Sequence, residues 1–391
     1  MSGASGEGEI RFGSRPLSDT TTDSSRTSRP HQDGFGRYQV TQRDGQRCST
    51  ADGYLRPAMD RPNLTVETNV QVHRVLFEGQ RACGIVGYRL DTEWEIRAER
   101  EVILSAGAYN SPQLLMLSGI GPADLLTALD IPVVLDQPLV GQNLQDHPQT
   151  PLIFAHSHPI SLLAAGEPES VRQYMEQRRG PLTSNGPEVG GFVRTAPGLA
   201  APDLQFHTAP MMFADGGLHP PIHHAISYGG CVLAPESRGS VMLASGDPTA
   251  KPAIRHNYFA EEADMRVAVE GPRIGLEIAR QQALKPYTET PFMPPESDSD
   301  ADLRTHVRRY SQTLYHPSGT CAMGTVVDAD LRVNGVEGLR VVDASIMQTV
   351  VRGNTNAPVI AIAEKASDVI RGVAPLPAVD TTLAGLAGVA D

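Results

Sequence analysis

The chain has 391 residues, and its 45 acidic residues outnumber its 33 basic residues, which gives a formal net charge of −12. Proteins that bind nucleic acid normally carry a basic surplus, so this balance argues against a nucleic-acid partner. Hydrophobic residues make up 40% of the chain, which is enough for one large domain or two medium ones.

The sequence lacks the usual features of a membrane or secreted protein. It has no run of 18 apolar residues, and its first residues form neither a basic nor an apolar segment, so we expect no membrane span and no secretory signal. The four cysteines, at positions 48, 83, 231 and 321, form no CxxC pair that could bind zinc. A reducing, cytoplasmic location is therefore the simplest prediction.

The chain begins with a polar leader that is followed by strands. Residues 14–29 hold nine Ser or Thr in sixteen positions, so we interpret residues 1–33 as a disordered leader. Apolar residues then alternate with polar ones from Leu64 to Val72, and again from Val86 to Leu90 after a turn at 78–80. This period of two predicts an antiparallel hairpin or meander.

A strand, a turn and a helix are predicted next, at 101–119. Residues 101–104 predict a short strand, and Ser111 as N-cap, Pro112 at the first helical position and Gly119 after the last turn mark a helix. Such a junction lets a ligand meet backbone N–H groups at a helix N-terminus, although it is common in proteins.

For the rest of the chain we expect a segment that mixes helices and strands, followed by a strand and a helix. Residues 150–310 are rich in Pro, Gly and His and contain two helices, 169–178 and 262–280, the second interrupted at 271–272. We expect an antiparallel sheet with helices on one side. A strand at 338–343 leads to a helix that begins at 356–358 and ends before Gly372.

His316 is the one candidate catalytic residue that the sequence suggests without any comparison to a family. The chain contains no GxSxG, HExxH, GxxxxGKS/T or EF-hand motif, which removes most support for hydrolase and nucleotide-phosphate functions. His316 is bounded by Pro317 and Gly319, so the backbone can hold it in the fixed geometry of a general base. A structural histidine is the alternative, and spacing does not decide between them.

Five ordered blocks resemble the glucose-methanol-choline (GMC) flavin oxidoreductases. Residues 105–121 (SAGAYNSPQLLMLSGIG) are similar to the second signature of that family. Four further blocks resemble the same family in order: residues 61–65, 140–147 (VGQNLQDH), 316–324 (HPSGTCAMG) and 341–347. The similarity runs from about Gly34 to Gly372 and points to the choline-dehydrogenase-like branch.

The resemblance implies a fold that combines α+β and α/β parts: the C-terminal part of a FAD-binding Rossmann-like domain, and a substrate domain with an antiparallel sheet flanked by helices. It implies a partial FAD-binding domain at 34–150, a substrate-binding domain at 151–310, a C-terminal FAD-binding and catalytic segment at 311–372, and a tail at 373–391. Members of the family begin with a strand, a GxGxxG turn and a helix, which this sequence does not contain. We therefore expect an N-terminally truncated member.

By the same resemblance, His316 is the catalytic base, and Asn354 takes the place of the family's second His or Asn and steadies the developing alkoxide. Asn356 faces the pyrimidine end of the flavin, and Glu188 belongs to the substrate cavity. The other cofactor residues are Asp343 and Ala344, beside the ribityl and diphosphate portion, and Val72, Ala106 and Gly107, near the adenosine.

Several of these residues also have a structural interpretation. Asn354 could be a turn residue, Asn356 an ordinary N-cap, Val72 a core valine and Glu188 a surface carboxylate. These alternatives stay open on the sequence alone.

The activity implied by the resemblance is FAD-dependent oxidation of a primary alcohol to an aldehyde, by hydride transfer to flavin N5, with oxygen or another acceptor taking the electrons. The alternative is a non-catalytic remnant, or the C-terminal half of a split enzyme whose partner chain carries the GxGxxG unit. Trp94 is the single tryptophan, so an aromatic cage for choline has little material. His219, His223 and His224 predict a substrate-cavity loop, and no metal is expected.

Overall fold

The computed structural model describes residues 11–12, 15–16, 32–90, 92–374 and 377, and the chain divides into two compact units. Unit 1 comprises Met1–Arg61, His147–Ala234 and Glu261–Leu314, and unit 2 comprises Pro62–Asp146, Pro235–Ala260 and Tyr315–Asp391. Of the predicted leader, the structure describes residues 32–33 and the antiparallel pair β1 (Arg11–Phe12) and β2 (Arg15–Pro16). The rest of the leader and most of the predicted tail lie outside the described residues.

Unit 1 is built on an antiparallel sheet, as predicted. Within the described residues the sheet has seven strands, in the order β18-β12-β15-β14-β13-β3, with β19 paired to β12. The strands are β3 (Gly34–Arg37), β12 (Pro148–Ala155), β13 (Val189–Val193), β14 (Leu204–Ala209), β15 (Ala225–Val232), β18 (Thr290–Phe292) and β19 (Gln312–Thr313).

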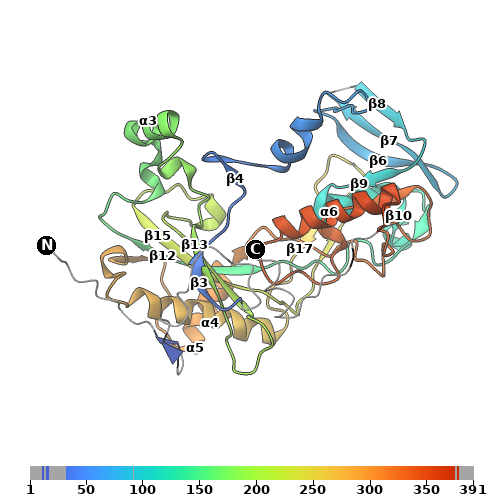
Figure 1. Ribbon diagram of the computed structural model, residues 1–391. Helices are drawn as coiled ribbons and strands as arrows, with labels where there is room; N and C mark the ends of the chain where they lie inside the picture. The colour runs from blue at the N-terminus through green and yellow to red at the C-terminus, as the bar shows by residue number, and fades with distance from the viewer. Residues whose placement is uncertain (1–10, 13–14, 17–31, 91, 375–376, 378–391) are drawn as a thin grey trace. The chain divides into compact units, whose positions relative to one another are not determined.

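Helix α4 (Glu262–Ala279) packs along strands β12, β14 and β15, and α5 (Asp300–Tyr310) packs on α4 (Figure 1). The predicted break is wrong, because α4 is continuous through Gly271 and Pro272. A Cβ on Gly230 of β15 would lie 2.8 Å from the Cα of Gly271, so these two glycines let helix and strand approach closely. The burial gained there outweighs the hydrogen bond that Pro272 cannot donate.

The other elements of unit 1 are short, apart from α3 (Pro168–Gln177), which matches the predicted helix and ends at Arg178 in a left-handed conformation. They are the hairpin of β4 (Gln42–Arg43) and β5 (Gln46–Arg47), a π-helical turn at Ala51–Leu55, and 3-10 turns at Arg56–Ala58, Leu162–Gly166, Pro181–Thr183, Asp215–Gly217 and Lys285–Tyr287.

Unit 2 contains the predicted meander, formed by β6 (Gln71–Glu78), β7 (Arg81–Arg89) and β8 (Thr92–Arg97) (Figure 1). The strand expected from Leu64 begins later, because residues 64–70 belong to no strand and Leu64 is exposed. Gln71 pairs with Tyr88, so only Arg89 of β7 remains beyond the pairing, and residues 64–70 lack a partner strand there. Alternation alone does not form a strand without a partner.

Short parallel pairs and two longer helices form the rest of unit 2. Its hydrophobic core includes Leu115, Met116, Cys321 and Val341, all less than 1% exposed. The elements are β9 (Val102–Leu104) parallel to β20 (Leu339–Val341), α1 (Gly107–Leu117), β10 (Ile120–Gly121) parallel to β11 (Leu135–Asp136), α2 (Ala123–Ala128), the antiparallel pair β16 (Ser240–Met242) and β17 (Ala253–Arg255), a 3-10 turn at Ala344–Ile346, and α6 (Asn356–Arg371).

The helix ends in unit 2 match the prediction better than the helix starts. Gly119 after α1 and Gly372 after α6 have φ of 87° and 68°, which confirms both as glycine terminators. The predicted N-cap Ser111 is wrong, because α1 already begins at Gly107. Asn356 is the first residue of α6 and Thr355 is its N-cap. Among the described helices, none combines enough length with enough apolar character to span a bilayer.

Candidate active site

The junction of β9 and α1 is held by the carboxylate of Asp343. Strands β9 and β20 run parallel, so the residues after them, including Asp343, meet at one edge. Asp343 is 6% exposed and accepts hydrogen bonds from the N–H of Gly107 (2.9 Å), the hydroxyl of Ser111 (2.5 Å) and the N–H of Ser345 (2.7 Å). This explains why α1 starts before Ser111: the hydroxyl that was expected to cap the helix binds Asp343 instead.

Two helix N-termini in unit 2 suit an anionic cofactor such as a flavin nucleotide. Neither α1 nor α6 has a hydrogen bond from the side chain of its N-cap residue, and in α1 the N–H of Gly107 is already bound by Asp343. Gly107 has φ of +85°, and a Cβ at this position would meet nothing within 4 Å. Ala106 and Asn356, beside the two helix starts, are exposed. Open backbone donors at a helix dipole favour negative charge, so these residues fit FAD.

His316 lies in a loop that is fixed by backbone hydrogen bonds. Its N–H donates to Oδ1 of Asp146 over 3.0 Å. Two residues later, Ser318 exchanges two backbone hydrogen bonds with Gln145, of 2.8 and 2.9 Å, and its hydroxyl donates to the carbonyl of His316. Gly319 follows with φ of +93°, and a Cβ there would come within 2.5 Å of the Asn143 carbonyl. His316 is 7% exposed, and burial lowers the pKa of its imidazole while Asp146 opposes that shift.

Residues 143–146, which bind the His316 loop, also bind the part of the chain that leads to Asn354. The side-chain amide of Gln145 donates to the carbonyl of Gln348 (2.9 Å), and its oxygen accepts the N–H of Val350 (3.2 Å). Asn354 itself is exposed, just before α6. His316 and the approach to Asn354 are therefore fixed by one short segment, 143–146.

A buried polar network surrounds Asp146, whose side chain is 0% exposed. Its Oδ2 accepts the Tyr258 hydroxyl and lies 3.6 Å from Nδ1 of His256. The other ring nitrogen of His256 is hydrogen-bonded to the Tyr109 hydroxyl, at 3.1 Å. Burial lowers the pKa of His256, and Asp146 partly opposes it.

Sequence reasoning missed Asp146, Tyr109, His256 and Tyr258 as possible site residues. The available signal was the acid next to a histidine in the 140–147 block, which was used only as a family signature. Tyr258 lies 112 residues from Asp146 in the sequence, so no spacing rule connects the two.

The predicted site residues do not all lie in one unit. Val72 is half-buried in β6, and Ala344 is partly exposed in the 3-10 turn at Ala344–Ile346. Glu188 belongs to unit 1, where it is exposed next to β13 and its carboxylate accepts the hydroxyl of Ser184 (2.5 Å). The residues in unit 2 are Val72, Ala106, Gly107, His316, Asp343, Ala344, Asn354 and Asn356.

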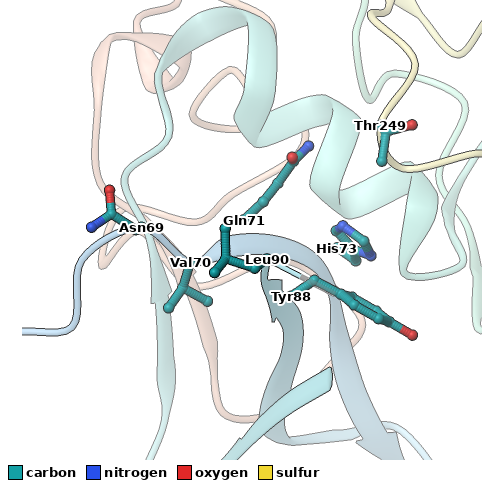
Figure 2. Close-up of a pocket in the computed structure, with 7 residues that line it drawn as sticks. All are labelled: Asn69, Val70, Gln71, His73, Tyr88, Leu90 and Thr249. Carbon is teal, nitrogen blue, oxygen red and sulfur yellow. The ribbon is translucent and has the colours of Figure 1, made fainter. Parts of the chain in front are cut away.

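Each unit also has a surface hollow. In unit 2, a hollow of about 870 Å³ lies beside the meander, and the His73 ring stacks on Tyr88 there, with centroids 4.8 Å apart (Figure 2). In unit 1, His223 of the predicted substrate-cavity loop lines a hollow of about 330 Å³ with His156 and Glu289. Within the described residues no three His, Cys, Asp or Glu side chains are grouped to hold a metal ion.

Comparisons with known proteins identify the family of the chain. Two sequence models of the GMC oxidoreductase family match residues 16–149 and 235–363. An uncharacterized GMC-type oxidoreductase of Mycobacterium tuberculosis is 47% identical over 355 residues, which is 88% of this chain and 67% of that protein. An oxygen-dependent choline dehydrogenase of Pseudomonas putida is 43% identical, over 88% of this chain and 63% of the relative.

Solved structures give the same result. Pyridoxine 4-oxidase from Mesorbium loti has a TM-score of 0.77 and 28% identity, over 88% of this chain and 66% of its own. An Aspergillus oryzae formate oxidase, whose structure concerns modification of its FAD, has a TM-score of 0.80 and 28% identity, over 87% and 66%. The chain thus spans about two thirds of the length of its relatives, and FAD is the cofactor that these relationships support. The chain belongs to the GMC oxidoreductase family, in its choline-dehydrogenase-like branch.

Proposed function

We propose that the protein acts in the FAD-dependent oxidation of a primary alcohol to an aldehyde, with His316 as the base. The observation that carries the proposal is the fixed, buried loop of His316 beside the Asp146 carboxylate, in the same unit as two helix N-termini whose N-cap residues make no side-chain hydrogen bond. The identity to an oxygen-dependent choline dehydrogenase supports oxidation of a CH–OH group.

In the proposed reaction, one alcohol loses a proton and a hydride and becomes one aldehyde. When bound, FAD supplies the acceptor for the hydride of the carbinol carbon. His316 takes the hydroxyl proton, because burial lowers its pKa and leaves the imidazole neutral and able to accept it at neutral pH. The side-chain amide of Asn354 donates a hydrogen bond to the developing alkoxide. An electron acceptor, oxygen or another, would complete the balance of the two electrons.

The same family relationship supports roles for the residues around the cofactor. We assign Asn356, at the start of α6, to the pyrimidine end of the flavin, where a helix N-terminus stabilises negative charge. Asp343 and Ala344 are assigned to the ribityl and diphosphate portion, with the Asp343 side chain acting through the turn that it fixes. Val72, Ala106 and Gly107 are assigned to the adenosine.

For substrate binding we assign Glu188 in unit 1. Its exposed carboxylate could attract a cationic alcohol, and the choline dehydrogenases among the relatives favour that class. The competing role is structural, since Ser184 already donates a hydrogen bond to it. Substitution of Glu188 by Gln separates the two roles: loss of attraction raises KM for a cationic alcohol and leaves KM for a neutral alcohol unchanged.

The proposed organisation keeps a partial FAD-binding domain at 34–150, a substrate domain at 151–310 and a cofactor-binding and catalytic segment at 311–372. The four free cysteines are compatible with the proposed cytoplasmic location.

A second candidate is a remnant, or one half of a split enzyme that needs a partner chain with a GxGxxG unit. The observation that favours it is the sheet of β9 and β20, which has two parallel strands within the described residues. Ile103 of β9 is 43% exposed, whereas parallel sheets are normally covered on both faces.

The test is the visible spectrum of the purified chain after incubation with FAD and gel filtration, followed by anaerobic addition of primary alcohols. Retained flavin that bleaches with an alcohol supports the oxidoreductase. Retained flavin that no alcohol in the panel bleaches counts against it. Flavin that is retained and bleached only after a GxGxxG-bearing chain is added supports the split enzyme, and failure even then leaves the remnant.

A further inference from the structure

Asp146 belongs to none of the roles assigned above, yet its carboxylate is fully buried beside His316. Burying a carboxylate is unfavourable unless hydrogen bonds compensate, so its oxygens need partners. Both oxygens have them: Oδ1 accepts the N–H of His316 at 3.0 Å, and Oδ2 accepts the hydroxyl of Tyr258. With each oxygen bound to a different segment, the carboxylate cannot rotate without breaking one of these bonds.

The Asp146 carboxylate also acts electrostatically on the His316 ring, because it opposes the lowering of that ring's pKa by burial. The titratable side chains that face it come from the loop after β17, which carries His256 and Tyr258, and from α1, which carries Tyr109 beside His256. Burial lowers the pKa of His256 and raises that of Tyr109, so both are neutral at neutral pH.

We propose that Asp146 is a positioning residue for His316. It fixes the backbone of the base through Oδ1, and its charge stabilises the imidazolium that forms when His316 takes the hydroxyl proton. Tyr258 holds Oδ2 and moderates this charge. The inference rests on the proposed function of His316 as the base, but the electrostatic link between the two residues can be measured without FAD or substrate.

The experiment follows the His316 ring by NMR in the full chain with isotope-labelled histidine, as the pH is lowered. His316→Gln identifies its signals among those of the 12 histidines. Asp146→Asn keeps the shape and the acceptor for the His316 N–H but removes the charge, so the His316 titration should move down by about one pH unit. Tyr258→Phe removes the hydroxyl that moderates the charge, so the titration should move up.

Asp264→Asn is the matched control, because Asp264 is also a buried aspartate (3% exposed) but belongs to α4 of unit 1. It should leave the His316 titration in place. Opposite shifts in the Asp146 and Tyr258 variants, with none in the control, support the proposal. An unchanged titration in both variants, or the same shift in the control, overturns it. If Asp146→Asn does not fold, the upward shift in Tyr258→Phe decides alone.

This outcome is separable from that of the proposed function. If His316→Gln keeps full alcohol oxidation while the NMR shifts occur, His316 is not the base, although Asp146 still controls its protonation. If the shifts are absent while His316→Gln is inactive, the base is correct and the role of Asp146 is wrong.

Discussion

Replacement of Asp343 by Ala tests the junction of β9 and α1, on which the cofactor site depends. The change removes the acceptor for three donors: the N–H groups of Gly107 and Ser345 and the hydroxyl of Ser111. Because Asp343 is 6% exposed, water replaces that acceptor poorly. At about 1–1.5 kcal/mol for each hydrogen bond, the free energy of unfolding of unit 2 should fall by about 3–4.5 kcal/mol.

Urea unfolding followed by circular dichroism measures this change, with the shift in midpoint multiplied by the slope. Asp247→Ala is the control, because that carboxylate also accepts two hydrogen bonds, from the N–H and hydroxyl of Thr249, but is exposed. The control should lose much less stability than the Asp343 variant. Equal losses in the two variants would refute the reasoning, since burial would then not matter. The Asp343 variant should also retain less FAD than the control.

Three further outcomes follow from packing and from buried histidines. Gly230→Ala should destabilise unit 1 by about 1–3 kcal/mol, because the new Cβ meets Gly271 at 2.8 Å. Gly166→Ala is the control: its Cβ meets nothing within 4 Å, so stability should change by less than about 0.5 kcal/mol. Similar urea midpoints for the two variants would contradict the close approach of α4 and β15. Leu115→Ala, at a fully buried position, should cost about 2–5 kcal/mol in unit 2, and a loss below about 1 kcal/mol would argue against the assigned core. Burial lowers the pKa of His306, so the folded state binds fewer protons than the unfolded chain. The free energy of unfolding should therefore decrease as the pH falls from about 7.5 through the ordinary histidine pKa of about 6.5. His306→Gln should lessen that decrease, and an unchanged pH dependence would contradict it.

Much of the fold could be predicted where the signal is local. The meander, the antiparallel sheet and the glycine ends of α1 and α6 follow from residue alternation and from left-handed backbone positions. The errors arose where a distant contact overrides the local preference. Ser111 looks like an N-cap until Asp343, 232 residues away, binds its hydroxyl, and Pro272 looks like a break until Gly230 is placed against α4.

The candidate site shows the same division. Contiguous blocks that resemble the family identify His316, Asn354 and the cofactor residues as candidates. The partners of Asp146 were not, because Tyr258 and His256 come from a different loop and have no motif of their own. A buried network of this kind is defined by tertiary structure, so it becomes visible only once the loops are placed.

The most direct test of the central claim is the rate of anaerobic flavin reduction by a primary alcohol, measured by stopped flow in the FAD-loaded protein and in His316→Gln. If His316 takes the hydroxyl proton, both proteins retain FAD and the variant is reduced about 100-fold more slowly or worse. Reduction of the variant at the rate of the unmodified protein, with equal FAD content, would contradict the assignment of His316 as the base.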